Sequence, residues 1–143
     1  MILVLCVGGK IDSFSEDWKV ITRREDFLPV EGDKIYSIHW HWKIPENICK
    51  SYRCIGFHST DLPYGKGSNP IGRMKDKKFR ETILTAFEIT GEYDSGPIVM
   101  KRELSLYGSK DAVLARAYAT CAYMIRYIEE FGYPMYIPQE EYH

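Results

Sequence analysis

One histidine and one aspartate have the settings best suited to acid and base chemistry. His58 follows the apolar run 54–57, which predicts the end of a buried strand. The Pro- and Gly-containing stretch 59–71 after it predicts an ordered loop, and Asp94 lies in a second tight turn, 93–97. Ligands of open α/β sheets bind at the carboxyl ends of the strands, and a carboxylate placed there can orient an imidazole. The two residues therefore predict a catalytic pair at one edge of a sheet.

The residues around His58 form a longer pattern, His-x-Thr-Asp-Leu-Pro-x-Gly-x-Gly, followed later by Asp-x-Gly. This pattern resembles the central motif of the N10-formyltetrahydrofolate-dependent formyltransferases, which act on methionyl-tRNA, glycinamide ribonucleotide or sugar nucleotides. The resemblance is best from about residue 35 to about residue 130. The family's catalytic Asn, two positions before the His, is replaced by Gly56. The matching positions are His58, Thr60, Leu62, Pro63, Gly67, Pro70, Asp94 and Gly96.

The resemblance implies N-formyl transfer from 10-formyltetrahydrofolate to a primary amine. The acceptor would be an amino-sugar nucleotide or a similar small metabolite, with methionyl-tRNA as another possibility. His58 would act as acid, base and oxyanion donor, and Asp94 as its orienter and as a proton relay. Thr60, Lys66 and Gly67 would contact the acceptor. The folate would be held by two loops, comprising His39, Trp40, His41, Trp42 and Ile44, and Ile89, Thr90, Gly91, Glu92 and Tyr93.

Glycine at position 56 leaves the oxyanion without the amide that the family pattern would supply. Loss of one such donor lowers a rate by about 10²–10³-fold, which describes a slow enzyme. Three replacements are conceivable, namely His41, the hydroxyl of Thr60 or a bound water. The alternative is a catalytically weakened relative that binds folate or a partner without turnover.

A zinc site is the third hypothesis. In a strand over 34–42, His39 and His41 point to one face. Together with His58 they could hold zinc and leave a position open for water, as in a zinc-dependent hydrolase. A plain aromatic core with hydrogen-bonded histidines is also consistent with the pattern. Because no suitably spaced carboxylate is present, the folate loop is preferred, the core comes second, and no metal ligand is assigned.

Composition limits the remaining choices. With 143 residues and a net charge of −1, we expect one domain, residues 1–143, without the basic surface typical of nucleic-acid binding. The resemblance implies an abbreviated N-terminal half and no C-terminal acceptor domain. No apolar stretch approaches about 20 residues, so a cytoplasmic protein is expected, and the four cysteines suit reduced, buried thiols. Exposed Tyr and Trp side chains weakly favour a homodimer.

The pattern of apolar residues predicts an α/β domain with a mostly parallel twisted sheet and a long C-terminal helix, and the resemblance implies that the sheet is shortened. Strands are predicted over residues 2–7, 19–22, 34–42, 53–58, 80–89 and 98–104. Helices are predicted over 45–52, from Pro70 onward and over 109–131, with a short helical turn near Trp18. The tail 132–143 is expected on the surface. The long helix has a stripe of residues at helical spacing, which we assign to the core and not to a ligand site. This stripe consists of Leu114, Ala117, Tyr118, Cys121, Ile125 and Ile128.

Overall fold

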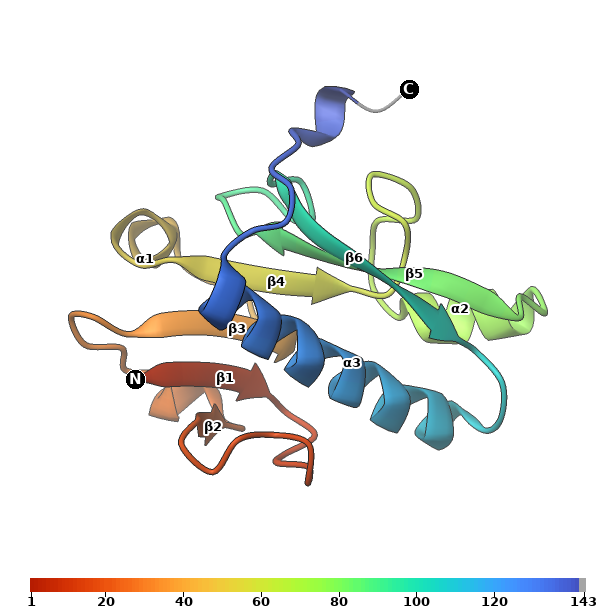
Figure 1. Ribbon diagram of the computed structural model, residues 1–143, viewed down its shortest axis with the longest axis horizontal. Coiled ribbons are helices and arrows are strands. Elements are labelled where there is room, and N and C mark those ends of the chain that lie inside the picture. Colours follow the sequence, from red (N-terminus) through yellow and green to blue (C-terminus); the bar gives the residue numbers. More distant parts are fainter. Residues whose placement is uncertain (142–143) are drawn as a thin grey trace.

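Residues 1–141 form a mixed six-stranded sheet with three α-helices (Figure 1), as described by a computed structural model. The strand order is β2-β1-β3-β4-β5-β6. The strands are β1 (Ile2–Cys6), β2 (Lys19–Ile21), β3 (Lys34–His39), β4 (Cys54–His58), β5 (Glu81–Glu88) and β6 (Ile98–Ser105). The helices are α1 (Glu46–Ser51), α2 (Pro70–Asp76) and α3 (Lys110–Phe131), with 3-10 turns at Arg24–Asp26 and Gln139–Glu141.

The first four strands run in one direction, β5 runs against them, and β6 runs against β5. β1 pairs in parallel with β2 and β3, and β3 with β4, whereas β5 is antiparallel to both β4 and β6. A parallel crossover needs a dozen or more residues, so the link 89–97 is too short for one and β6 turns back beside β5. The predicted fold class, a shortened and mostly parallel α/β sheet with a long C-terminal helix, is confirmed.

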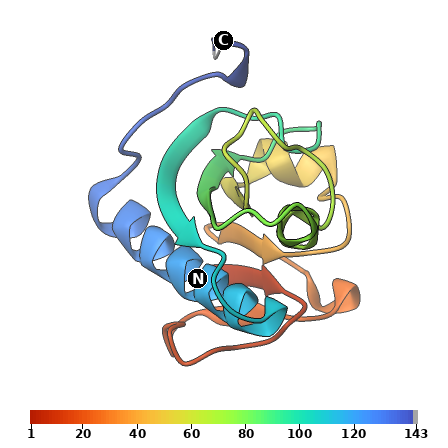
Figure 2. The same cartoon turned by 90° about the vertical axis from the view of Figure 1, so that its right-hand side faces the viewer.

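Helices cover both faces of the sheet. Figure 2 shows α3 on one side of the curved sheet and α1 on the other. The start of α3 is fixed by Ser109, whose Oγ accepts the backbone N–H of Ala112 at 3.1 Å. The core under α3 includes Val4, Tyr36, Ile55, Leu84, Ala117, Cys121 and Ile125, and the core under α1 includes Leu3, Leu5, Ile35, Ile44 and Cys54. Within residues 1–141, no helix is both long and apolar enough to span a bilayer.

Two local predictions are corrected. The strand predicted over 34–42 ends at His39, where a register shift against β1 leaves Ile38 as an extra residue. The helical turn expected near Trp18 is instead a tight turn, in which the Trp18 N–H donates to the carbonyl of Ser15 at 3.1 Å. The first difference arises because pairing with β1 overrides the local pattern.

The C-terminal tail lies on the surface, as predicted, except that Gln139 is buried and the tail is attached to the sheet. Ile137 forms an isolated antiparallel bridge with Ile98 at the start of β6. Gln139 is only 4% exposed, and its Nε2 donates to the carbonyls of Asp94 and Gly96 at 2.7 and 2.8 Å. Residues 142–143 of the predicted tail lie outside the described part.

A charged cluster joins the end of α3 to the sheet. Glu129 accepts hydrogen bonds from Lys34, from the hydroxyl of Tyr36 and from Arg53. Burial raises the pKa of Glu129, but the hydrogen bonds from Lys34 and Tyr36 and the charge of Arg53 outweigh it, so its pKa lies below the ordinary 4.5. The pairs therefore stabilise the fold while Glu129 is ionised.

Replacing Glu129 by Gln should lower the free energy of unfolding by about 1–3 kcal/mol at pH 7, because Arg53 loses a partly buried partner. A lowered folded-state pKa means that this contribution is present above pH 4.5 and is lost as the pH falls through the folded-state value. Urea unfolding at pH 7 and pH 3.5 should therefore show the variant and wild type converging in acid. Glu130→Gln, on the exposed neighbouring residue, is the control, and an equal loss in both variants would contradict the assignment.

Candidate functional site

A cavity of about 1060 Å³ lies at the carboxyl ends of β3 and β4. Because these strands are parallel, His39 and His58, their last residues, reach the same edge of the sheet. The cavity extends from this edge onto both faces, toward Phe87 and Ile89 on one side and toward Leu114 of α3 on the other. All of the predicted site residues except Thr60 line it.

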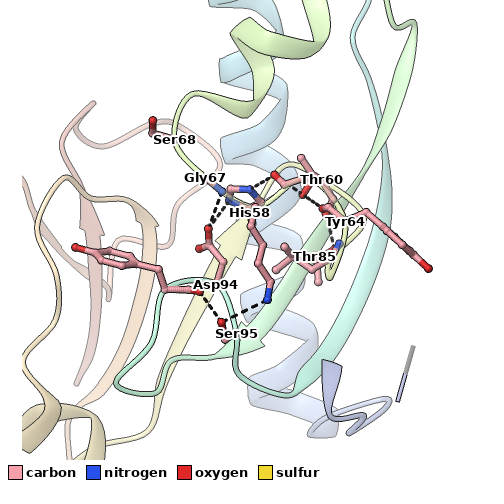
Figure 3. A network of polar contacts seen from close by, with 12 residues as sticks. His58, Thr60, Tyr64, Gly67, Ser68, Thr85, Asp94 and Ser95 are labelled. Carbon is pink, nitrogen blue, oxygen red and sulfur yellow. Dashed lines mark hydrogen bonds and ion pairs between the residues drawn. The ribbon is translucent and has the colours of Figure 1, made fainter. Parts of the chain in front are cut away.

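The proton position on His58 is set by a backbone carbonyl. Its Nε2 lies 3.0 Å from the oxygen of Gly65, which can only accept, so Nε2 carries the hydrogen. In the neutral ring, Nδ1 then has a free lone pair, and it lies 3.7 Å from Oδ2 of Asp94 (Figure 3). The expectation that Asp94 fixes the tautomer is therefore corrected, because Gly65 does so. Asp94 is placed to stabilise the imidazolium once Nδ1 takes up a proton.

Asp94 is carried by a loop that runs back along β4. At the start of β4, the N–H of Ile89 donates to the carbonyl of Cys54. Near the end of β4, Oδ2 of Asp94 lies beside His58 and accepts the N–H of Gly67. Asp94 itself has a positive φ of 53°, which Asp tolerates better than most residues. Gly96 has no room for a side chain, since a Cβ there would lie 2.8 Å from the carbonyl carbon of Glu88. The Asp-x-Gly spacing thus allows the loop to fold over β4.

Thr60 organises the loop after β4 and does not face the cavity. Its hydroxyl donates to the carbonyl of Tyr64 at 2.7 Å, and its own carbonyl accepts from Thr85 at 2.7 Å. Gly65 has a positive φ of 75° and packs against the side chain of Thr60. A Cβ at position 65 would lie only 2.8 Å from Cγ2 of Thr60, so glycine is required there. Thr60 thereby positions the carbonyl that holds His58. The structure does not place its hydroxyl where it could meet an acceptor or an oxyanion, so that expectation is corrected.

Arg73 of α2 is a site-supporting residue that the sequence did not reveal. Its guanidinium donates to the carbonyls of Gly65 and Gly67 at 3.1 and 3.3 Å, and to Ser68 at 3.0 Å. Lys66, predicted to meet the acceptor, lies on the cavity and donates to Ser95 Oγ at 3.4 Å. Arg73 thus ties the His58 loop to α2, whereas the contacts of Lys66 with Ser95 and of Gly67 with Asp94 tie it to the Asp94 loop (Figure 3).

The backbone at Gly56 is covered by two side chains. A Cβ at this position would lie 2.8 Å from Cζ of Phe87 and 3.1 Å from Cγ1 of Ile89. Because real Cβ contacts are longer, an Asn at position 56 would require Phe87 to move. Substituting Asn for Gly56 would therefore not restore the side-chain hydrogen-bond donor without repacking of Phe87.

The two loops predicted to hold folate face each other across the cavity. Trp40 and Trp42 stack edge to face, with ring centroids 4.9 Å apart, on one loop, and Thr90 to Tyr93 form the other. Cys49 of α1 links them, because its Sγ contacts the carbonyls of Ile44 and Thr90 at 3.8 and 3.6 Å. Burial raises the pKa of Cys49, so the thiol stays protonated and can act as the hydrogen-bond donor in these contacts.

The histidines are not arranged as a metal site. His39 and His41 lie 5.3 Å apart between ring centroids, but in the described chain no group of three or more His, Cys, Asp or Glu side chains could hold an ion. His58 is turned instead toward Gly65 and Asp94. The zinc-hydrolase hypothesis thus has no ligand geometry to support it.

Part of the α3 stripe also lines the cavity, which corrects its assignment to the core alone. Leu114 is half-buried, and Ala117, Tyr118 and Cys121 combine core packing with a cavity surface. The helical spacing of these residues predicted that they are buried, but it did not indicate that they also border a cavity. Lys110, at the start of the same helix, is another cavity residue that was not predicted.

The fold and the site together define the class. A methionyl-tRNA formyltransferase from Clostridium thermocellum has a TM-score of 0.78, with 24% identity over 96% of this chain and 66% of that one. The formyltransferase PseJ from Anoxybacillus kamchatkensis, solved with a formamido sugar nucleotide and tetrahydrofolate, has a TM-score of 0.66, with 19% identity over 99% of this chain and 82% of that one. The protein has the formyltransferase fold.

Sequence comparison specifies the relationship further. The methionyl-tRNA formyltransferase of Rickettsia bellii is 28% identical over 95 residues, which cover 65% of this chain and 31% of that protein. The matched segment is thus less than a third of that curated relative. No protein-family model matches the chain. The resemblance to the formyltransferase family is confirmed by these relatives and by the structural neighbours.

The contacts of Gln139 generate a test of the tail. Gln139→Leu removes both hydrogen bonds to the Asp94 loop and leaves two carbonyls unpaired, which should lower the free energy of unfolding by about 1–3 kcal/mol. Amide hydrogen exchange over residues 91–97 should accelerate in the variant. Glu140→Ala, on the exposed next residue, should leave exchange unchanged. Equal exchange in Gln139→Leu and wild type would show that the tail does not hold the loop.

Proposed function

We propose that this protein transfers a formyl group from 10-formyltetrahydrofolate to the primary amine of a small metabolite. The observation that carries the proposal is the pair of His58 and Asp94 on one continuous cavity, in the motif shared with formyltransferases. The neighbouring PseJ structure contains tetrahydrofolate, which supports a folate donor here. The two aromatic and backbone-lined loops at residues 39–44 and 89–93 offer a flat pterin both stacking surfaces and backbone hydrogen-bonding groups.

The proposed chemistry uses the proton arrangement at His58. The acceptor nitrogen attacks the formyl carbon, and its proton passes to Nδ1 of His58, whose lone pair is free because Gly65 holds the hydrogen on Nε2. Asp94 stabilises the resulting imidazolium across 3.7 Å. The C–N10 bond then breaks, and the imidazolium returns the proton to N10 of the folate. His58 therefore acts as base and then as acid.

The size and lining of the cavity support a small acceptor. Ligand cavities range over about 300–1,000 Å³, so the 1060 Å³ here is sufficient for a folate and a second small molecule together. We place the folate on the Phe87 and Ile89 side and the acceptor on the α3 side, where Leu114 and Lys110 line the wall. An amino-sugar nucleotide is our first acceptor class. Methionyl-tRNA, the substrate named for the sequence relatives, is the other.

A folate-binding protein without turnover is the second candidate. The observation that favours it is Gly56, where Phe87 and Ile89 occupy the space that a donor side chain would need. The two candidates share the folate site and differ in whether the formyl group is transferred. Both binding and turnover must therefore be measured.

Calorimetric titration with 5-formyltetrahydrofolate should show saturable binding to the full chain. Trp42→Ala should weaken it, because the stacked Trp40 and Trp42 pair forms one wall of the donor site. Loss of one aromatic contact is worth about 0.5–1.5 kcal/mol, a change of about 2- to 12-fold in Kd. Tyr107→Ala, an exposed aromatic residue outside the cavity, is the control. Absence of binding at millimolar ligand would overturn both candidates.

Turnover should depend on His58 and Asp94. His58→Ala should lower kcat by about 10²–10⁴-fold, the usual range for loss of a general base, while folate affinity stays near the wild-type value. Asp94→Asn should also lower kcat, because an amide does not stabilise the imidazolium. Formylated product is measured with amino-sugar nucleotides and with methionyl-tRNA as acceptors. Folate binding with no product above the no-enzyme level would establish the second candidate instead.

A further inference from the structure

The transfer step places negative charge on the formyl oxygen, and the groups assigned so far leave that oxygen without a donor. The N–H of His58 is directed at Gly65, the hydroxyl of Thr60 at Tyr64, and Gly56 has no side chain. A donor aimed at the developing charge is commonly among the largest contributions to such a reaction. The required group must line the cavity near His58, carry a hydrogen on nitrogen or oxygen, and be fixed in position.

His39 meets these conditions through its contact with α3. Its Nδ1 forms a short hydrogen bond with the hydroxyl of Tyr118, and its carbonyl accepts the N–H of Val7 at 2.8 Å. Tyr118 is only 5% exposed, and a Cβ on the facing Gly8 would lie 2.9 Å from its Cε2, so the ring has little room to move. Both the backbone and the imidazole of His39 are therefore held in place.

The tautomer of His39 is linked to its hydrogen bond with Tyr118, because the phenol can either donate to Nδ1 or accept from it. Burial, followed by the neighbouring Cys6, raises the pKa of Tyr118, so the phenol keeps its hydrogen. Burial and the charge of His41 lower the pKa of His39, which keeps the imidazole neutral near pH 7. When the phenol donates to Nδ1, the ring hydrogen resides on Nε2, and this is the tautomer that donation from Nε2 requires. Nε2 has no protein partner within residues 1–141.

The position of His39 follows from the pairing of β3 with β4. Ser37 lies opposite Gly56, and His39 and His58 each follow two residues later, on neighbouring strands about 4.8 Å apart. The extra residue Ile38 turns His39 toward α3, while His58 faces the opposite side of the sheet. Both imidazoles line the same cavity at the carboxyl edge of the sheet, from opposite faces.

We propose that His39 is a catalytic residue that donates its Nε2–H to the formyl oxygen, with Tyr118 as the residue that positions it. The inference rests on the proposed formyl transfer. As the acceptor nitrogen forms its bond to the formyl carbon, the carbonyl electron pair moves to the oxygen, which His39 stabilises without giving up its proton. When the C–N10 bond breaks, the pair returns to restore C=O, and the amine proton reaches N10 through His58. A donor from β3 thereby supplies what Gly56 cannot.

Hydroxylamine tests this role without knowledge of the natural acceptor, because formyl transfer to it yields formohydroxamate, which ferric iron colours. At saturating 10-formyltetrahydrofolate, His39→Leu should lower kcat by about 10²–10³-fold, whereas His39→Gln, whose amide N–H can reach a similar point, should stay within about tenfold of wild type. Tyr118→Phe should lower kcat by about fivefold, the effect of one hydrogen bond. Tyr123→Phe, an exposed tyrosine of the same helix, is its matched control.

Three results would overturn the inference, and they are distinguishable. If His39→Leu raises the calorimetric Kd for 5-formyltetrahydrofolate but keeps kcat at saturation, His39 only binds the donor. If Ser37→Ala lowers kcat as strongly as His39→Leu is expected to, the hydroxyl opposite Gly56 is the donor instead. If the wild type forms no formohydroxamate above the no-enzyme level, the proposed function fails, and the inference fails with it. Circular dichroism spectra and melting temperatures like those of wild type confirm that each variant is folded.

Discussion

The site depends on the carbonyl oxygen of Gly65. It accepts from Nε2 of His58 and so determines which nitrogen of the ring is free to take a proton. The loop that presents this oxygen is held by the hydroxyl of Thr60 from within and by Arg73 from α2. Asp94 is then joined to the same loop through the N–H of Gly67. The carbonyl of Gly65 thus connects the end of β4 to α2, and the same loop reaches the Asp94 loop through Gly67.

The strands and the long helix could be predicted because their apolar spacing follows directly from burial on one or two faces of a sheet. The site was found because its residues lie in two short, distinctive stretches, around His58 and Asp94. Contacts between distant segments could not be predicted in this way. In the sequence, Arg73 is an ordinary cation of a helix and Gln139 an ordinary polar residue of the tail. The sequence around each residue does not indicate which distant backbone carbonyl its side chain reaches. Thr60 was misjudged because a hydroxyl beside a catalytic histidine gives no sign of which way it points.

The substitution at position 56 changes more than one side chain. Phe87 and Ile89 fill the space above Gly56, so the apolar lining of the folate side of the cavity is continuous there. Removal of a polar group from this wall leaves no buried amide to satisfy, which favours a close fit to a flat ring. In the proposed reaction, polar stabilisation of the reacting group comes from the other side of the strand ends, where His39 and Tyr118 meet.

The arrangement of the chain separates two tasks. His58, its loop and Asp94 all come from one continuous stretch, β4 to the turn before β6, folded as an antiparallel unit on one side of the sheet. The wall formed by β3 and α3 comes from segments before and after that stretch. Sequence drift in these outer segments can therefore reshape the space for an acceptor while the proton-handling pair keeps its geometry. In evolutionary terms, the proposed reaction would be inherited as a module, and the choice of substrate could diverge around it.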